Sequence, residues 1–307
     1  MQISIATANF YFLPFQQTLE IIAEAGFEHI ELDLYWERGP WAIAQHLKGV
    51  EVREVVDMIS RFGLKVSSIH DTGGVVNNAH SIQGFVNPQL KEYVDQLGYA
   101  PGCIVFHTPH IEGPYNQIWW QTVSDDIVKA AESYRSSETS VTVENMPFFD
   151  GYYVPLTTPQ ELLAFVSKNE LGVTLDTTHY AQIGVDVVQA ACVLQKKIKT
   201  IHLSDFVDGK THVFIGNGEL DFTNLFRVLD LSTLHSITLE CSVGFLGENA
   251  LDLMQTEMVG RLKTAMSRLQ SWIKVAQVMV GATVAGRPAR WRGVRRVLVQ
   301  QPYHAGH

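Results

Sequence analysis

The sequence is poor in cysteine and has no long apolar run. Its cysteines, Cys103, Cys192 and Cys241, are odd in number and lack the spacing of a metal site. They suit buried thiols in a reducing compartment better than a disulfide framework, so we expect a cytoplasmic protein. No stretch reaches the roughly 18 apolar residues of a membrane span. Met1 leads directly into an apolar run without a basic leader. We therefore expect no signal peptide and no membrane contact.

Glycine-rich phosphate loops are also missing. Neither a GxGxxG motif nor a GxxxxGKS or GxxxxGKT motif follows the first predicted strand. This absence disfavours an open doubly wound sheet that binds a dinucleotide or nucleotide at that loop.

Positive charge is scarce outside the C-terminal end. The formal net charge is −9, and residues 276–307 hold five arginines, Arg287, Arg290, Arg292, Arg295 and Arg296, with no acidic residue. Removing these five from the 23 basic residues leaves 18 against 32 acids, so residues 1–275 carry −14. Such a body repels a phosphate backbone, and we expect no nucleic-acid partner.

The apolar pattern repeats a unit of strand followed by helix. Eight short buried strands are predicted, at residues 3–7, 29–33, 65–70, 103–107, 140–144, 171–176, 199–202 and 236–240. Helical stripes follow several of them, for example Val52, Val55, Val56 and Ile59. A capping box at Thr158 to Glu161, with Pro159 at the first position, marks the start of another helix.

No tight hairpin joins two neighbouring strands of this set, which requires a parallel sheet with crossover helices. The count of eight predicts closure into a (β/α)8 TIM barrel, an α/β fold of one domain. We place this barrel at residues 1–273, where the last apolar stripe, from Met254 to Ile273, ends. Residues 274–307 are predicted to be a poorly ordered, Arg-rich C-terminal extension.

Residues of metal-ligand type end six successive strands from the third onward: His70, His107, Glu144, Asp176, His202 and Glu240. His179, Asp205 and His212 follow just beyond strand ends. In a TIM barrel the active site lies at this end of the strands. A set of imidazoles and carboxylates without thiolate suits a divalent metal ion such as Mn²⁺, Zn²⁺, Co²⁺ or Mg²⁺.

These motifs resemble the xylose-isomerase-like TIM barrel superfamily, which includes sugar phosphate isomerases and epimerases and is related to apurinic endonuclease IV. The resemblance covers roughly residues 1–273. It rests on SSIHD (67–71), VFHTP (105–109), VTVEN (141–145), LDTTH (175–179), IHLSD (201–205), HVFIGNGELDF (212–222) and TLEC (238–241).

The resemblance to the epimerase-like members implies one divalent cation held by Glu144, Asp176, His202 and Glu240. It also implies that Glu144 and Glu240 act as catalytic acid and base, and that His179 contacts the sugar. The chemistry agrees, because a metal ion that polarises a carbonyl stabilises an enediolate, and two carboxylates can remove and return a proton. We assign His70, His107, His179, Lys210 and His212 to substrate binding.

The resemblance to endonuclease IV implies instead a cluster of three zinc ions, with His70, His107, His179 and His212 as further ligands. Where that family carries an Asp ligand two residues before His212, this chain has Lys210. A cation there should weaken a third metal site. The acidic body also disfavours DNA.

We therefore predict a metal-dependent sugar or sugar-acid isomerase or epimerase that acts through an enediolate on a small sugar-like molecule. The alternatives are an apurinic-site endonuclease, a related dehydratase, and a barrel that binds a ligand without catalysis. The sequence is compatible with a homo-oligomer.

Overall fold

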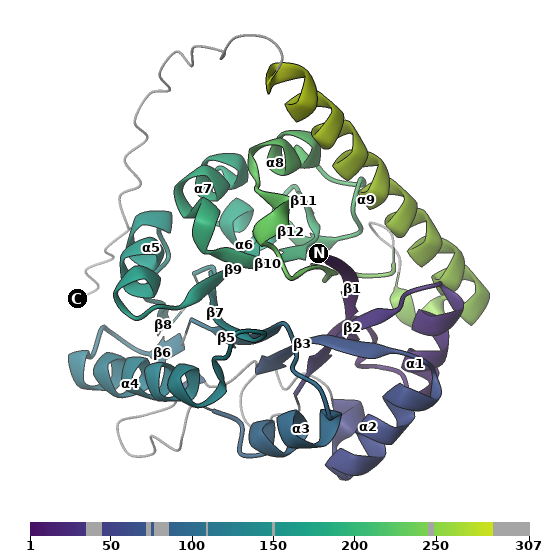
Figure 1. Cartoon of the computed structure of the whole chain (residues 1–307), viewed down its shortest axis with the longest axis horizontal. Coiled ribbons are helices and arrows are strands. Elements are labelled where there is room, and N and C mark those ends of the chain that lie inside the picture. Colours follow the sequence, from purple (N-terminus) through teal and green to yellow (C-terminus); the bar gives the residue numbers. More distant parts are fainter. Residues whose placement is uncertain are drawn as a thin grey trace.

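Eight parallel strands surround one axis in the computed structural model, which describes residues 1–34, 45–71, 75–76, 86–108, 110–148, 151–244 and 249–284 (Figure 1). They close into a barrel in the order β1-β13-β10-β9-β7-β5-β3-β2. The barrel strands are β1 (Gln2–Ala6), β2 (His29–Asp33), β3 (Lys65–Asp71), β5 (Cys103–His107), β7 (Ser140–Glu144), β9 (Gly172–Asp176), β10 (Ile198–Leu203) and β13 (Ser236–Leu239). The predicted (β/α)8 barrel is confirmed.

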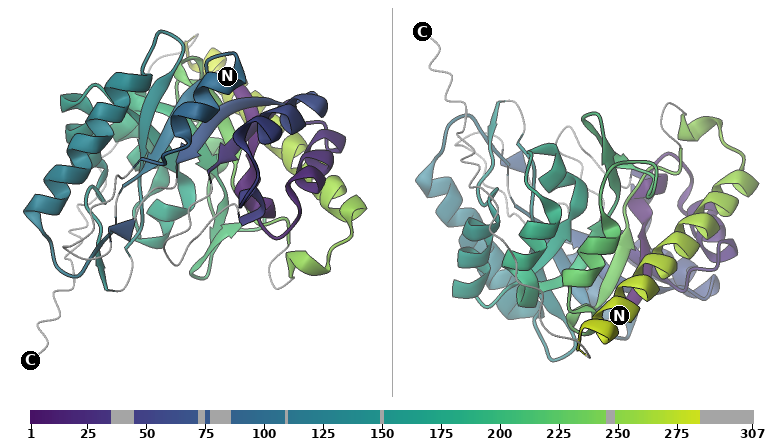
Figure 2. Two further views of the ribbon diagram at one scale, coloured as in Figure 1. Left: turned by 90° about the horizontal axis from the view of Figure 1, so that it is seen from below. Right: turned by 90° about the horizontal axis from the view of Figure 1, so that it is seen from above.

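Helices cover the outside of the barrel, as the views in Figures 1 and 2 show. They are α1 (Phe15–Glu24), α2 (Val52–Arg61), α3 (Leu90–Leu97), α4 (Gln117–Tyr134), α5 (Pro159–Lys168), α6 (Thr177–Gln182), α7 (Val187–Leu194), α8 (Phe222–Val228) and α9 (Gln255–Val284). The last helix, α9, contacts both α8 and α1 and so closes the ring of helices.

Local sequence signals explain where several helices begin and which face they bury. The capping box predicted at Thr158 forms at the start of α5, with Glu161 bonding back to the cap. In the stripe of α2, Val52, Val55 and Ile59 are buried. Met254 departs from its predicted place in the last helical stripe, because it lies before the first residue of α9 and is 66% exposed.

The predicted end of the barrel at residue 273 falls inside α9. The helix continues to Val284, and Ala276 is buried against the core. The rest of the predicted extension, residues 285–307, lies outside the described residues, so its predicted disorder stays a prediction. None of the described helices is both long enough and apolar enough to cross a membrane.

Two small sheets at the strand ends were not predicted. Strands β4 (Val75–Val76), β6 (His110–Glu112) and β8 (Tyr152–Tyr153) form one, and the antiparallel hairpin of β11 (Asp205–Val207) and β12 (Lys210–Val213) forms the other. Both belong to segments that follow barrel strands. They therefore add to the end of the barrel where the predicted site residues lie.

The four strands that carry the predicted metal ligands at or next to their ends have a buried threonine two residues before each ligand. Thr142 Oγ1 lies 2.7 Å from Thr174 Oγ1, linking β7 to β9. Thr200 and Thr238 occupy the same place in β10 and β13 and are fully buried. Because side chains two residues apart in a strand share a face, each threonine lies beneath a ligand-type residue on the same side of the sheet.

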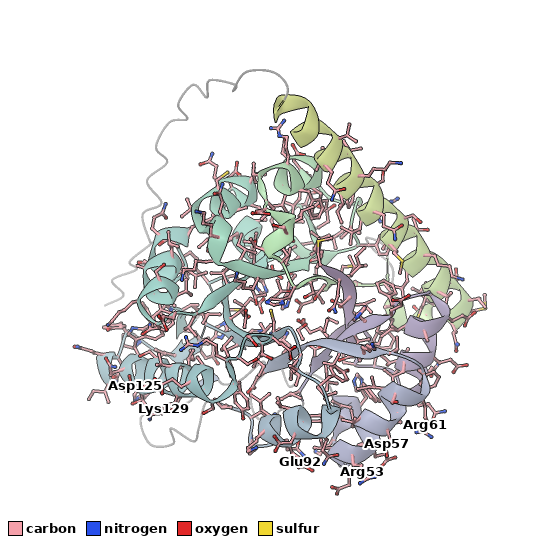
Figure 3. The ribbon with its side chains drawn as sticks, in the orientation of Figure 1. Arg53, Asp57, Arg61, Glu92, Asp125 and Lys129 are labelled. Atoms are coloured by element: carbon pink, nitrogen blue, oxygen red, sulfur yellow. The ribbon has the colours of Figure 1, made fainter. Side chains whose placement is uncertain are left out.

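Charged side chains gather on the outer faces of the helices. Figure 3 labels Arg53, Asp57 and Arg61 on α2, Glu92 on α3, and Asp125 and Lys129 on α4 at the periphery of the molecule. The pair Arg53 and Asp57, 3.8 Å apart, is largely exposed. Such surface pairs contribute little to stability, so the fold depends on the buried core and the barrel ladder.

Candidate metal centre

The ends of β7, β9, β10 and β13 bring four predicted ligands together. Glu144, Asp176, His202 and Glu240 each offer a ligand atom, and these atoms all lie within 4.8 Å of one another. His202 Nδ1 lies 2.6 Å from Glu240 Oε2 and 3.3 Å from Glu144 Oε2. This spacing is that of donors around one cation, and all four strands are consecutive in the barrel order.

Backbone contacts fix the directions of Glu144 and Asp176. Asn145, next to Glu144, bridges β7 and β9: its Nδ2 donates to the carbonyl of Asp176, and its Oδ1 accepts from the N–H of Asp176. Asp176 is also the N-cap of α6, accepting the backbone N–H of His179 through Oδ1. The two carboxylates therefore approach each other from anchored backbone positions.

Several buried polar atoms of this group, most of them in ion-pair contacts, make no hydrogen bond in the described part of the chain. They are both carboxylate oxygens of Glu144, Oδ2 of Asp176, both ring nitrogens of His202 and Oε2 of Glu240. A buried polar atom without a hydrogen bond is costly. A divalent cation would satisfy convergent oxygen and imidazole acceptors at once, so these residues fit a metal ion.

Imidazoles surround Glu144, which is fully buried. Its carboxylate oxygens lie 3.2 Å from His70 Nε2, 3.5 Å from His107 Nε2 and 3.1 Å from His179 Nδ1. Burial alone would raise the pKa of Glu144, but the neighbouring histidines, His202 foremost, together outweigh it and lower the pKa well below its usual value. Glu144 is thus held as a carboxylate.

The histidines divide into two electrostatic classes. Burial lowers the pKa values of His70, His179 and His202, but neighbouring carboxylates outweigh burial. The net effect is to raise the pKa of His179 to about 9 and those of the other two well above their usual value. For His107, burial prevails and lowers the pKa well below its usual value. His107 is therefore a neutral ring suited to accept or donate a hydrogen bond.

His70, His107 and Glu144 form a further group whose ligand atoms lie within 4.8 Å of one another. The rings of His70 and His107 meet edge to face at 4.7 Å between centroids. This group shares Glu144 with the first one, so the two would lie side by side on a common carboxylate.

The residues beyond the strand ends occupy different surroundings. The rings of His179 and His212 lie 5.3 Å apart, and His212 Nδ1 lies 3.1 Å from the carbonyl of Glu240, so both join the edge of the cluster. Lys210 is exposed on β12. Its predicted contact with a substrate stays a prediction.

Asp205 points to backbone rather than to the cluster. Its two carboxylate oxygens accept the N–H groups of Phe206, Gly216, Gly218 and Leu220. A side chain at Gly218 would collide with this carboxylate, which explains the glycine. Asp205 therefore organises the loop after β12.

Two residues of the candidate site, Glu31 and Asp33 of β2, were not identified from the sequence. Both are fully buried and share the inner face of the strand. Glu31 Oε1 lies 2.9 Å from His202 Nε2, and Asp33 Oδ1 lies 3.2 Å from His70 Nδ1. The sequence shows that both carboxylates share one side of the strand, because they occupy alternate positions, but it does not show that this side faces inward.

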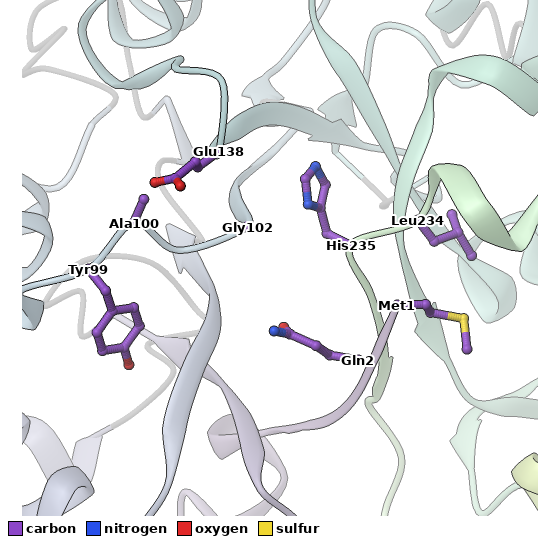
Figure 4. Close-up of a pocket in the computed structure, with 8 residues that line it drawn as sticks. All are labelled: Met1, Gln2, Tyr99, Ala100, Gly102, Glu138, Leu234 and His235. Atoms are coloured by element: carbon purple, nitrogen blue, oxygen red, sulfur yellow. The ribbon is translucent and has the colours of Figure 1, made fainter.

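A separate cavity of about 420 Å³ lies at the opposite end of the barrel. Figure 4 shows it between the residues that precede or begin barrel strands, including Gln2, Gly102 and His235. In TIM barrels this end serves stability, whereas catalysis takes place at the carboxyl ends of the strands. The cavity is therefore distinct from the metal-ligand cluster.

Comparisons with known proteins agree with this architecture. A family model described as the xylose isomerase-like TIM barrel matches residues 19–258. The solved structure of L-ribulose 3-epimerase has a TM-score of 0.68 at 19% identity, with 94% of this chain and 99% of that chain covered. D-psicose 3-epimerase from Clostridium cellulolyticum H10, solved with D-tagatose, gives 0.61 at 14%, covering 89% and 99%.

An AP endonuclease of family 2 from Brucella melitensis gives a TM-score of 0.59 at 17% identity, covering 80% of this chain and 95% of that chain. The sequence has no match among curated proteins. At these identities the likeness to solved structures shows the fold alone.

Proposed function

The chain belongs to the xylose isomerase-like TIM barrel family, and we propose that it is a metal-dependent isomerase or epimerase of a small sugar or sugar acid. The observation that carries the proposal is the convergence of Glu144, Asp176, His202 and Glu240 within 4.8 Å at the ends of neighbouring strands. Solved structures that share the fold include L-ribulose 3-epimerase and D-psicose 3-epimerase, which supports a sugar as the substrate class.

Glu144, Asp176, His202 and Glu240 would hold the ion. A bound divalent cation supplies a Lewis acid that polarises a carbonyl and favours the enediolate. Asp176 serves binding alone, since its other oxygen caps α6. The two glutamates have further capacity, because each has a second carboxylate oxygen.

Glu144 and Glu240 would exchange the carbon-bound proton. They stand on β7 and just after β13, with β9 and β10 between them, so a substrate bound at the cluster meets one carboxylate from each side. Glu144 is fully buried, whereas 14% of the Glu240 side chain is exposed. Glu240 is therefore the carboxylate nearer to solvent. A proton taken from the substrate can reach water more directly from Glu240 than from Glu144.

The imidazoles at the edge of the cluster would orient the substrate. His107 and His179 are partly open to the barrel mouth, and sugar hydroxyl groups can donate to or accept from a ring nitrogen. His179 Nδ1 also contacts the carbonyl of Asn145, which fixes its ring. A substrate oxygen bound there would be placed beside Glu144.

The direct test combines metal analysis with a substrate screen. The full chain is purified without added metal, its metal content is measured, and it is then incubated with Mn²⁺, Co²⁺, Mg²⁺ or Zn²⁺ and a panel of free ketoses and cyclitols. The proposal expects one bound divalent ion and conversion of at least one ketose to an isomer of equal mass. A product lighter by one water would indicate the related dehydratase chemistry instead.

A specific observation favours a second candidate, an apurinic-site endonuclease. His70, His107 and Glu144 form a second donor group beside the first, which more than one metal ion would use. Against it stands the charge of −14 on residues 1–275, because DNA binding requires several phosphate contacts from basic side chains. Cleavage of an abasic-site duplex, together with more than one bound ion, would establish this function in place of the first.

A further inference from the structure

Strand β2 presents two buried carboxylates, and each is directed at a different histidine. Glu31 Oε1 lies 2.9 Å from His202 Nε2, while its distance to His70 Nδ1 is 3.6 Å. Asp33 Oδ1 lies 3.2 Å from His70 Nδ1. The shorter contacts therefore pair Glu31 with His202 and Asp33 with His70.

Each carboxylate is anchored through its other oxygen. Ser68 Oγ donates to Glu31 Oε2 at 2.6 Å. Asp33 Oδ2 accepts the hydroxyl of Thr7 at 3.0 Å and the backbone N–H of Ala8 at 2.8 Å. The oxygens that face the histidines make ion-pair contacts with the rings and no hydrogen bond among the described residues. The anchoring thus leaves one oxygen of each carboxylate for one imidazole.

The contact between Glu31 and His202 crosses the interior of the barrel. Strands β2 and β10 are separated by β1 and β13 in the barrel order, and both side chains are fully buried. His202 turns Nδ1 toward Glu240 and Glu144, and Nε2 toward Glu31. A cation bound at Nδ1 takes the place of a proton there, so the one N–H of the neutral ring lies at Nε2 and faces Glu31.

We propose that Glu31 is the positioning residue of His202. With a cation at Nδ1, Glu31 would accept the Nε2–H that lies 2.9 Å from it and so fix the ring and its tautomer. This inference rests on the proposed function, because it gives His202 the part of a metal ligand. Carboxylates behind ligating histidines are a general means of raising ligand basicity and orientation, and their loss lowers metal affinity.

The competing explanation makes Glu31 a ligand itself. Glu31, His70, His202 and Glu240 also have donor atoms within 4.8 Å of one another. In that case Glu31 would bind an ion directly, and His202 Nε2 would be its neighbour in the coordination sphere. The two explanations differ in metal stoichiometry and in the spectrum of the bound ion.

The experiment compares Glu31→Gln with Asp33→Asn in the full chain, after removal of metal with a chelator and titration with Co²⁺ alone. Both substitutions remove one buried carboxylate charge from the same strand and preserve size. Asp33 faces His70 rather than a residue of the proposed ligand set, so Asp33→Asn is a control for the lost charge. Circular dichroism before titration checks that each variant is folded.

We expect Glu31→Gln to raise the dissociation constant for Co²⁺ by about 10- to 100-fold, and Asp33→Asn to raise it clearly less. The visible absorption bands of bound Co²⁺ should shift in Glu31→Gln and stay in place in Asp33→Asn. Ser68→Ala, which removes only the hydroxyl anchor of Glu31, should change affinity in the same direction by a smaller factor. If Glu31→Gln does not fold, Ser68→Ala replaces it in the comparison with Asp33→Asn.

Equal losses of affinity in Glu31→Gln and Asp33→Asn, with unshifted bands, would overturn the inference, because charge alone would then explain them. Two ions in the unmodified protein and one in Glu31→Gln would overturn it in favour of a ligand role. Failure of the proposed function looks different: the unmodified chain would bind no Co²⁺ at all.

Discussion

The backbone N–H of His179 donates to Oδ1 of Asp176 at 2.6 Å, whereas Oδ2 of the same carboxylate is buried without a hydrogen-bond partner in the described structure. One oxygen thus serves the fold by capping α6, and the other is left for the cluster. This division of labour within one side chain separates a structural effect from a functional one and leads to the first prediction.

Asp176→Asn should leave the protein folded but strongly reduce metal retention. Asparagine caps helices as well as aspartate does, but it has one neutral acceptor in place of a second anionic oxygen. Asp176→Ala should lose the metal and also about 1 kcal/mol of stability through the missing cap. Metal content by mass spectrometry and thermal melting distinguish the two effects. Full metal content in Asp176→Asn would remove Asp176 from the ligand set.

Asp205→Asn should destabilise the protein without emptying the metal centre. Oδ2 of Asp205 accepts from both Gly216 and Gly218, and an amide NH₂ there would face two donors. We expect a loss of at least about 2 kcal/mol, since hydrogen bonds to a charged acceptor are the stronger kind. Asp208→Asn, at an exposed position of the same hairpin, is the matched control. Comparable melting temperatures for both variants would disprove this role.

His235 should make the protein less stable in mild acid. Burial, aided by Lys199 and the N-terminal amine, lowers its pKa from the ordinary 6.5, and its Nε2 lies 3.1 Å from Ser140 Oγ. The unfolded chain therefore binds the proton at a higher pH than the folded chain does. The stability that neutral His235 contributes is complete above about pH 6.5 and falls as the pH drops toward the pKa of His235 in the folded protein.

The measurement is the melting temperature from about pH 5 to pH 8 for the unmodified protein and for His235→Gln. Other histidines shift in both directions, so the test is the difference between the two curves. The difference in melting temperature between the two proteins should narrow as the pH falls. Only the unmodified protein loses stability through protonation of His235. A constant difference would show that His235 titrates alike in both states.

A chain ended after Val284 should fold and bind metal like the full chain. Helix α9 reaches Val284, and among the described side chains of its last turns Ala276 is buried while Val278 is 66% exposed. A cut near residue 275 would remove the packed Ala276 and should lower the melting temperature. Gel filtration and melting of both truncations check this. Aggregation of the longer one would show that residues beyond 284 are needed.

Much of the architecture follows from local pattern. Eight short strands separated by helical stripes predict a parallel barrel, and ligand-type residues at strand ends predict where its site lies. Thr142, Thr174, Thr200 and Thr238, each two residues before a predicted ligand, reinforce the assignment. They define the inner face of their strands, so the same pattern orients the residues that follow.

The remaining features depend on contacts between distant segments. Glu31 and Asp33 alternate with Ile30 and Leu32, a pattern that in an isolated strand is equally typical of a solvent-facing side. Only closure of the barrel turns that side inward and brings Glu31 to His202 from across the interior. The role of Asp205 could not be predicted for the same reason, because its partners Gly216, Gly218 and Leu220 lie in a loop whose path the sequence does not reveal.

The removal and return of a carbon-bound proton by Glu144 and Glu240 is tested most directly by turnover in heavy water. With a ketose that the screen identifies, the account predicts deuterium on the carbon next to the carbonyl of the product. Glu144→Gln and Glu240→Gln should each abolish turnover while the protein stays folded. Conversion of the substrate without any solvent label, under slow turnover, would contradict the account and indicate a hydride shift or a hydrolytic reaction instead.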